Sequence, residues 1–437
     1  MLSHPEQKES NKKNYHSIKK RLLLMKKMLW VILMMSTGTS FTSPLFPLYQ
    51  EHYRLSSLQI TVLFAVYAVA LLPTLFIVGS RGSSWGLKRV LRISILLSIL
   101  ASILFMASHQ AWLVYAARML VGIAYGSFTG TAVAFLLKQT PKEKSGKAIL
   151  LSGMAVSVGF GLGPALAGLI IEYLHFMPLR APFWVLTVLL LSAWAGLETL
   201  RDEDYQAHKE RQQAASVPIS LRVSADIKPH FLSFSALPVF TLFTLNGIVL
   251  SLIPSFVKNV IHTSNLAVSG LLILLLMGGG TMMQMLPWFK HPVVRLRIGI
   301  TLLAFGAWLV VLSGTLESIS LMWAGVLVQA LGSGWTFQIS LRLAGELPHV
   351  SERSRVITTY YFSGYIGFIV PIVGVGLLSF LFNLYMSLIV LNVLATLIVL
   401  YMLGYSVKFA RYYAERNEKQ AQVEGFPAKV SSQVLRP

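Results

Sequence analysis

Twelve stretches of this chain are each long and apolar enough to cross a lipid bilayer alone. A transmembrane helix needs about 20 apolar residues to cross about 30 Å of hydrocarbon. The stretches are residues 28–50, 58–79, 90–107, 112–137, 148–173, 183–200, 234–257, 266–288, 297–315, 319–343, 356–381 and 384–406. Because lipid offers no water to peptide groups, spanning segments must be helices or barrel strands. The runs are continuous rather than alternating, so the sequence predicts an all-α integral membrane protein.

The composition excludes several other classes of protein. Hydrophobic residues make up 55% of the chain and charged residues only 12%, with a mean hydropathy of +0.65, whereas soluble domains average about 25% charged residues. Cysteine is absent, which excludes a disulfide framework and a thiolate metal site. The sequence contains no phosphate-binding loop and no cluster of metal ligands. We therefore expect no enzymatic activity, no cofactor and no metal.

The positive charges are distributed unevenly between the two predicted sides. The chain has 37 Lys and Arg against 17 acidic residues, a net charge of +20. If the N-terminus and every second loop share one side, nearly all Lys and Arg lie there. The exceptions are Arg54, Arg180 and Lys258 on the other side and Arg92, Arg118 and Arg342 within spans. Since basic loops stay in the cytoplasm, we predict a multi-pass protein of the plasma (bacterial inner) membrane with both termini cytoplasmic, and no nucleic-acid partner.

The longest internal polar segment separates the sixth span from the seventh. The predicted parts are a basic cytoplasmic tail (1–27), an N-terminal six-helix bundle (28–200), a cytoplasmic linker (201–233), a C-terminal six-helix bundle (234–406) and a cytoplasmic tail (407–437). The two halves also share a proline spacing: Pro141 and Pro164 are 23 residues apart in the first half, and Pro348 and Pro371 are 23 residues apart in the second. The pattern predicts two pseudo-symmetric bundles related by an axis along the membrane normal.

The fifth span contains an unusual run of small residues, "SVGFGLGPALAGLIIEY". One helical face carries Ser157, Gly161, Pro164 and Gly168, and an adjoining stripe carries Gly159 and Gly163. Small residues let membrane helices approach closely, and a proline is tolerated where neighbours satisfy the freed carbonyl. Two compatible interpretations follow, a tight packing seam and a bendable helix at a moving interface between the halves.

The same residues resemble a known family. Gly159, Gly163, Pro164 and Gly168 fill a Gly-x-x-x-Gly-Pro-x-x-x-Gly signature in the fifth span, and Arg118 and Gly122 fit an Arg-x-x-x-Gly pattern in the fourth. With twelve spans split six and six, the chain resembles the major facilitator superfamily, and more narrowly its drug/proton antiporter branch. The resemblance implies a fold of two pseudo-symmetric six-helix bundles.

The loop after the second span matches the superfamily's Gly-x-x-x-Asp-Arg-x-Gly-x-Lys-Arg motif in part. Gly79, Gly86, Lys88 and Arg89 fit, whereas Ser83 and Ser84 stand where the acid and the base are expected. In the family, that acid is thought to contact the opposite half and to stabilise the outward-facing state. A serine keeps a hydrogen bond but no charge, so we expect a less strongly latched cytoplasmic gate, or one that uses other contacts.

The resemblance implies a secondary active transporter that works by alternating access, binds a small-molecule substrate and protons, and is monomeric. The favoured prediction is a proton-coupled exporter, an antiporter of small amphipathic or drug-like molecules. One alternative is a dedicated exporter of an endogenous anionic metabolite, such as a siderophore-like chelator or a lipid-like compound. A second, less favoured alternative is a membrane sensor or scaffold that does not transport. Uptake also stays open, although the fifth-span signature favours export.

Ionisable residues inside a span are costly and are therefore functional candidates. None of the 17 acidic residues lies deep in a span, and all ten His lie in loops, tails or span ends. Arg118 is six residues beyond Trp112, about 9 Å into its span at 1.5 Å per residue. It is predicted to face the interior, where it either pairs with carbonyls or Glu172, or modulates a proton site or attracts an anionic substrate. Without a buried carboxylate, a neutral, amphipathic or anionic substrate is easier to accommodate than a dication.

Proton coupling then requires a carboxylate at the outer rim, or protonation of the substrate itself. The rim candidates are Glu51, which is beside His52, and Glu172. The substrate cavity is expected between the halves near the midplane. Its predicted lining combines aromatic side chains with neutral polar groups: Thr39, Ser43, Tyr125, Asn246, Gln284, Trp335, Gln338, Tyr361 and Tyr365.

Overall fold

The computed structural model describes residues 23–81, 85–140, 144–174, 176–200, 223–262, 265–286, 291–349 and 352–423 of the 437. Residues 1–22, Ser83, Ser84 and most of the predicted linker lie outside this description. All regular secondary structure in the described residues is helical, which confirms the predicted all-α class. The membrane-length helices of the first part are Leu23–Tyr53, which ends in η1 (Ser43–Leu45) and α2 (Phe46–Tyr53), α3 (Ser57–Arg81), α4 (Leu87–Met106), α5 (Ala111–Gln139), α6 (Ser145–Leu174) and α7 (Ala181–Glu198).

The second part begins with α9 (Lys228–Phe231), η4 (Leu232–Ala236) and α10 (Leu237–Ser251), which together form one span, Lys228–Ser251. It continues with α11 (Ile253–Asn259), α12 (Leu266–Met285), α13 (Pro292–Thr315), α14 (Ile319–Glu346), α15 (Arg353–Leu381) and α16 (Leu384–Val423). The helix of α16 thus runs well past residue 406, where the apolar run ends. Tyr413 Oη donates to Glu346 Oε2 at 2.9 Å, and Arg416 donates to the Glu346 carbonyl at 3.2 Å, so this extension is held against the end of α14.

Eleven of the described helices are both long and apolar enough to cross a membrane. The remaining predicted span corresponds to α14, which is 28 residues long but carries polar residues such as Gln329, Ser333 and Thr336. Those three side chains are buried, and α14 packs against α13, α12, α10 and α15. Because protein rather than lipid surrounds it, α14 tolerates polar groups that lower its hydropathy.

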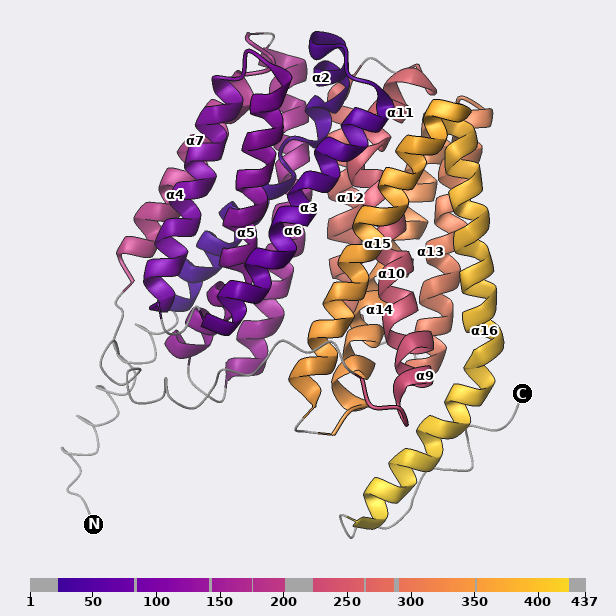
Figure 1. The fold of residues 1–437 in the computed structure, drawn as a ribbon. Coiled ribbons are helices and arrows are strands. Elements are labelled where there is room, and N and C mark those ends of the chain that lie inside the picture. Colours follow the sequence, from indigo (N-terminus) through magenta and orange to yellow (C-terminus); the bar gives the residue numbers. More distant parts are fainter. Residues whose placement is uncertain are drawn as a thin grey trace, which may run out of the picture.

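The helices form two groups that stand side by side (Figure 1). We call the helices up to α7 the first group and those from α9 onward the second group. One end of the molecule carries Arg81, Lys88, Lys138, Lys228 and Arg353 at the helix ends, and we call it the basic end. We call the opposite end, which carries Glu51, Glu172 and Lys258, the far end.

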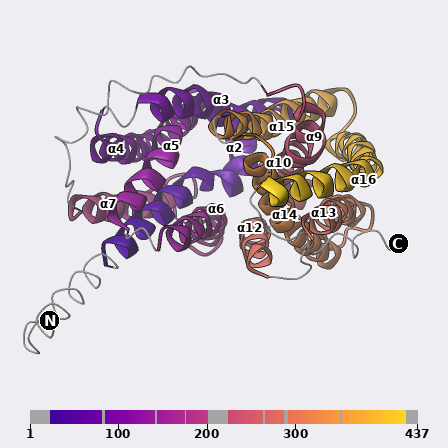
Figure 2. The same cartoon turned by 90° about the horizontal axis from the view of Figure 1, so that it is seen from below.

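Two helix pairs join the groups: α6 packs along α12, and α3 packs along α15. Viewed along the helices, both pairs lie at the middle of the molecule, with α4 and α7 at one edge and α13 and α16 at the other (Figure 2). Most sequence-distant contacts between the groups therefore pass through four helices.

The α6–α12 contact brings backbone against backbone. A Cβ atom added to Gly270 on α12 would lie 2.2 Å from the carbonyl oxygen of Pro164, and one on Gly168 would lie 2.8 Å from that of Leu266. Closer to the basic end, a Cβ on Gly161 would still meet Leu274 at 2.9 Å. No side chain larger than hydrogen fits at these positions without a shift, so glycine makes the contact possible.

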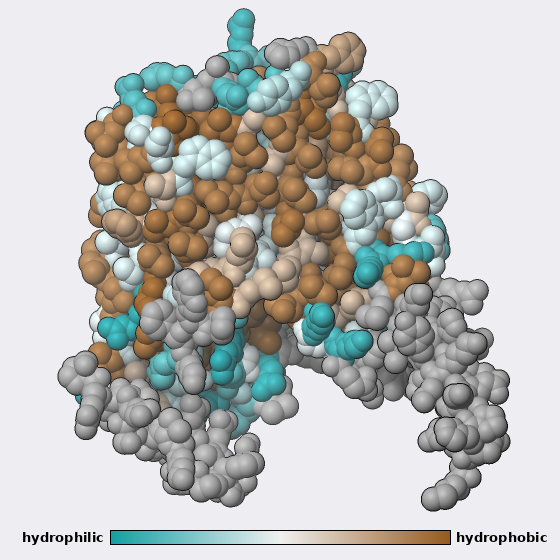
Figure 3. Space-filling view, turned by 180° about the vertical axis from the view of Figure 1, so that it is seen from behind, coloured by the Kyte–Doolittle hydropathy of each residue, from teal (hydrophilic) through white to brown (hydrophobic). Residues whose placement is uncertain are grey.

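Toward the basic end this tight packing is lost. A Cβ on Gly153 or Gly146 of α6, or on Gly278 of α12, would meet no heavy atom within 4 Å. The two helix groups diverge at this end (Figure 1), and the surface is hollowed between them there (Figure 3). The structure is thus closed at the far end and open at the basic end.

The two glycines of α12 provide a direct test of the contact. Gly270→Val would force Cβ into the Pro164 carbonyl, so we expect the variant to lose about 1–3 kcal/mol of stability, as overpacked sites do. Gly278→Val is the matched control on the same helix, and we expect a change within about 0.5 kcal/mol. Thermal unfolding in detergent measures both. Equal melting temperatures for the two variants would show that the α6–α12 contact does not support the fold.

Candidate functional site

At the far end, α2 and α11 join the two groups through polar side chains. Glu51 forms an ion pair with Lys258, and Ser255 Oγ donates to Gln50 Oε1 at 2.8 Å. The Glu51 side chain is 62% exposed, and solvent-exposed pairs contribute about 0–1 kcal/mol. His52 is also exposed, and its ring contacts Tyr53 edge-on.

Glu172 makes a second link between the groups. From the end of α6, its Oε2 accepts a hydrogen bond from the Leu266 N–H at 3.0 Å. Leu266 is the first residue of α12, and Asn265 caps the same helix start by accepting from Ala267. Because a carboxylate at a helix N-terminus satisfies an orphan donor and complements the helix dipole, this half-buried contact contributes more than the exposed Glu51 pair.

An aromatic layer closes the space just inside this rim. Phe64 of α3 lies 4.8 Å from Phe368 of α15, ring centroid to ring centroid, and Phe368 contacts Phe243 of α10 at 6.0 Å. One step farther out, a Cβ on Gly376 would overlap the side chain of Thr61. The α3–α15 contact therefore seals the far end with packed rings and one glycine.

Arg118 lies against this layer, as the sequence predicts for a buried cation. Its residue is 2% exposed, and one guanidinium nitrogen donates to the Thr39 carbonyl at 2.7 Å. The guanidinium carbon lies 4.8 Å from the Tyr67 ring centroid and 5.7 Å from that of Phe64. Among the described residues its Nε has no hydrogen-bond partner. Carbonyl pairing, one of the predicted options, is what the structure contains, whereas the Glu172 carboxylate bonds to α12.

Four tyrosines, two from each helix group, follow one another from Arg118 across the interface. Tyr67, which stacks on Arg118, lies close to Tyr125 and, across the interface, to Tyr365, and Tyr365 lies close to Tyr361. Tyr125 also shares a 3.0 Å hydrogen bond with Ser36 and meets Phe160 edge-on at 5.5 Å. We call Tyr67, Tyr125, Tyr361 and Tyr365 the tyrosine cluster; three of its members, all but Tyr67, were predicted cavity residues.

The first span contributes further buried hydroxyls where it changes from α-helix to η1. Thr39 Oγ1 donates to the Met35 carbonyl at 3.0 Å, and the Thr39 carbonyl accepts from Arg118, so the predicted cavity role of Thr39 stays a prediction. Ser43 Oγ and Tyr49 Oη are buried and have no hydrogen-bond partner in the described part of the chain. The Tyr49 side chain also lies close to Arg118.

In the second group, the predicted amide Asn246 belongs to a buried network. Its Oδ1 accepts from Gln329 Nε2 at 3.1 Å and from Ser333 Oγ at 3.0 Å. Asn246 is on α10 and its partners are on α14, so the network fixes the register of these two helices. Each hydrogen bond in lipid-embedded protein is worth about 0.6–2 kcal/mol.

The remaining predicted amides lie nearer the basic end. Gln338 Nε2 donates to the Gln284 carbonyl at 3.0 Å, while its Oε1 has no partner among the described residues. Gln284 is only partly buried. Trp335, by contrast, is 1% exposed and therefore packs inside the second group. Gln338 and Gln284 thus join α14 to α12 within the second group.

The two small-residue stripes of α6 contact different neighbours. Gly159 and Gly163 face the first span, where an added Cβ would lie 2.6 Å from the Leu33 carbonyl and 2.2 Å from the Thr37 carbonyl. Pro164 and Gly168 face α12. Gly122 of α5 is equally tight, because a Cβ there would lie 2.2 Å from the Tyr67 carbonyl. The adjoining stripe thus packs within the first group, and the other makes the contact between groups.

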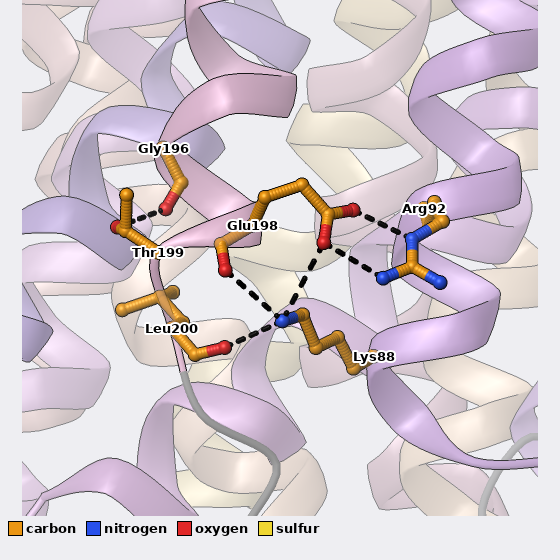
Figure 4. Close-up of polar contacts among 6 residues, drawn as sticks. All are labelled: Lys88, Arg92, Gly196, Glu198, Thr199 and Leu200. Atoms are coloured by element: carbon orange, nitrogen blue, oxygen red, sulfur yellow. Dashed lines mark hydrogen bonds and ion pairs between the residues drawn. The ribbon is translucent and has the colours of Figure 1, made fainter.

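The loop motif at the basic end forms a compact ionic cluster (Figure 4). Lys88 Nζ donates to the carbonyls of Leu200 at 2.6 Å and Glu198 at 3.3 Å. The Glu198 carboxylate accepts two hydrogen bonds from Arg92, at 2.6 and 2.7 Å, and lies 3.7 Å from Lys88 Nζ. The cluster therefore ties α4 to the end of α7 within the first group.

The other residues of this motif, Gly79, Gly86 and Arg89, do not take part in the ionic cluster. Gly86 has a φ of 85°, a conformation that L-residues rarely adopt, so glycine is required where α4 begins. A Cβ on Gly79 would meet nothing within 4 Å, and Arg89 is exposed. Because Ser83 and Ser84 lie outside the described residues, the expected weakening of this gate stays a prediction.

Several residues of the far-end closure escaped sequence reasoning. Phe64 and Phe368 look like ordinary apolar residues of a span, and Lys258 looks like a loop cation. The one usable signal was Lys258, which is one of only three basic residues that the sequence predicts on that side. No group of three or more potential metal ligands occurs in the described residues.

The family model described as Major Facilitator Superfamily matches residues 28–371. The chain is 28% identical over 211 residues to sodium-dependent phosphate transport protein 1 of Mus musculus, covering 45% of this chain and 44% of that protein. It is 25% identical over 167 residues to multidrug resistance protein 1 of Bacillus subtilis (strain 168), covering 38% and 42%. With quinolone resistance protein NorA of Staphylococcus aureus (strain MRSA252) the identity is 22% over 147 residues, covering 34% and 38%. Each match thus spans less than half of the curated relative.

Solved structures match over most of the chain. A bacterial homologue of the human lysosomal transporter Spinster, in an inward-facing and unoccupied conformation, has a TM-score of 0.70 and 14% identity, covering 90% of this chain and 98% of that one. A D-xylose–proton symporter has a TM-score of 0.70 and 13% identity, covering 87% and 97%. At such identities the likeness shows a shared fold.

Arg118 yields a stability test that separates its charge from its packing. Arg118→Met removes a desolvated cation, so we expect a melting temperature equal to or above that of the parent. Arg118→Lys keeps the charge but loses the planar stack on Tyr67, a contact worth about 2 kcal/mol when desolvated. We therefore expect the Arg118→Lys variant to have a lower melting temperature in detergent than the Arg118→Met variant. If Met proves much less stable than Lys, the fold itself needs the positive charge.

Proposed function

We propose that this chain, which belongs to the major facilitator superfamily, is a proton-coupled exporter of small amphipathic molecules in the drug/proton antiporter branch. It is a membrane transporter and not an enzyme. The observation that carries the proposal is the asymmetric closure: contacts between the groups concentrate at the far end, while the basic end opens onto the interface that holds the tyrosine cluster.

We assign the basic end to the cytoplasm, since Lys and Arg stay on that side. The described conformation then faces inward. Substrate enters from the basic end and lies against aromatic rings and neutral hydroxyls near the interface. The α6–α12 and α3–α15 contacts must separate for it to leave on the other side.

The rim carboxylates are where we propose that external protons act. The Glu172 carboxylate holds α12 of the opposite group through the Leu266 N–H. Protonation of the carboxylate weakens this hydrogen bond and its interaction with the helix dipole. External acid therefore favours opening of the far end and release of substrate. Glu51 acts in the same direction, but more weakly, because its pair with Lys258 is solvent-exposed.

Purified protein in liposomes, loaded with a fluorescent amphipathic dye, tests this proposal. We expect dye to leave through right-side-out protein faster when the outside is acidified. A cap worth about 1 kcal/mol corresponds to about fivefold in the opening equilibrium, so Glu172→Gln should lose most of the acid stimulation. Glu51→Gln should lose less.

Glu317→Gln is the control, because Glu317 is an exposed far-end acid in the loop before α14. It should keep the full response. Absence of any pH-gradient-dependent flux in the parent protein would contradict proton coupling. An undiminished response in Glu172→Gln would remove the rim carboxylate from the proposal.

A second candidate is a dedicated exporter of an anionic metabolite, which Arg118 favours. Arg118 is the cation buried deepest among the described spans, and its Nε is free to donate. An anion leaving an inside-negative cell gains about 2.3 kcal/mol per 100 mV from the membrane potential alone. Such export needs no proton carrier, which fits the absence of acidic residues deep in the spans.

Matched probes of different charge separate the two candidates. With a potassium diffusion potential and no pH gradient, an anion exporter should move a lipophilic carboxylate but not its neutral amide. Arg118→Met should then reduce carboxylate efflux by at least tenfold and leave any amide efflux unchanged. Equal losses for both probes would show that Arg118 does not select charge.

A further inference from the structure

A groove at the basic end lies outside the transport pathway. It has a volume of about 430 Å³ and is lined by Lys26, Lys27, Trp30, Ala195, Gly196 and Thr199. Its lining residues come from the start of the first span and the end of α7, and α7 stands at the edge of the first group away from the second group (Figure 2). We propose that this groove binds one anionic glycerophospholipid of the leaflet at the basic end, with the phosphate at the lysines.

Hydrogen bonds between its two walls hold the groove in shape. Lys27 Nζ donates to Thr199 Oγ1 at 3.0 Å, and Trp30 Nε1 donates to Ser192 Oγ at 3.2 Å. Both bonds fix the first span against α7. Gly196 forms the floor, where an added Cβ would lie 3.5 Å from Val31 and 3.9 Å from Trp30. The missing side chain leaves the room that the ligand occupies.

Among the described residues, the charge balance at this corner favours an anion. Lys26 is exposed at the groove mouth. The one nearby acid in the described residues, Glu198, is held by both Arg92 and Lys88 (Figure 4). Its negative charge is therefore offset before a ligand arrives. A basic residue near an anionic membrane surface strengthens binding roughly fivefold, so the two groove lysines suffice for a marked preference.

The surface beyond the groove suits an acyl chain. Trp184, Val188 and Leu191 are spaced along one face of α7 and are 62%, 65% and 44% exposed. Ala195 continues this row into the groove. Trp30 is 43% exposed and supplies the amphipathic ring typical of headgroup depth. The lysines can bind a phosphate group, and the exposed apolar row on α7 can bind an acyl chain. A phospholipid has both parts, whereas a free phosphate ion has only the first.

Native mass spectrometry of the full chain, with phosphatidylglycerol or phosphatidylcholine of identical acyl chains added, tests the proposal. We expect one retained phosphatidylglycerol with at least tenfold tighter binding than phosphatidylcholine. Lys26→Gln with Lys27→Gln should abolish the preference. Arg297→Gln with Arg411→Gln removes the same charge from exposed sites elsewhere at this end and should not.

A steric variant and a soluble competitor complete the test. Gly196→Leu should fill the floor and weaken both lipids, whereas Gly404→Leu, at an exposed glycine of α16 with open space around it, should weaken neither. Millimolar inorganic phosphate should not displace the lipid. Equal binding of the two lipids by the parent, a preference that survives the double lysine variant, or displacement by phosphate would each overturn the proposal.

Discussion

The backbone contact between α6 and α12 is the interaction on which the rest of this structure depends. Lipid supplies no hydrophobic force between helices, so association relies on close packing. The Pro164 carbonyl lies where a side chain on Gly270 would have to be, and a Cβ on Gly168 would also overlap the Leu266 carbonyl, at 2.8 Å. This short stretch, with Thr61 against Gly376 on the other pair, holds the two helix groups together at one end. Because the contact is confined to that end, the opposite end is free to part.

One helix therefore serves two purposes. The Gly159–Gly163 stripe of α6 packs against the carbonyls of the first span, so α6 belongs rigidly to the first group. Its other stripe contacts α12 of the second group. Small residues on both faces let this single helix pack inside the first group and also contact the second group closely. A motion between the groups then needs no rearrangement inside either one, which is what alternating access about a fixed site requires.

The charged residues also differ between the basic end and the far end of the molecule. Basic residues dominate one end, whereas at the far end Glu51 and Glu172 hold the groups together. Between them lies Arg118, which aromatic faces and a carbonyl stabilise without a carboxylate. If substrate binds beside Arg118, as we propose, the buried positive charge and the cost of desolvation both disfavour a cationic substrate. The proposed lipid groove lies at the basic end, where the positive charge favours anionic headgroups.

The amino-acid sequence by itself determined the membrane class, the helical class, the number of long helices and the burial of Arg118. These follow from local hydropathy and from the cost of an unsatisfied group in lipid, which depend on the chain and its solvent alone. Spacing within one helix likewise predicted both stripes of α6. Even α14, whose hydropathy is diluted by Gln329 and Ser333, was found by its length.

Only the tertiary structure decided which distant groups meet. Glu172 bonds to the Leu266 N–H rather than to Arg118, Glu51 finds Lys258, and Phe64 meets Phe368. Each pairing depends on the rotation and crossing of two helices far apart in the chain, and no local pattern encodes these. Asn246 could be identified as polar, yet its partners on α14 emerged only when the helices were packed.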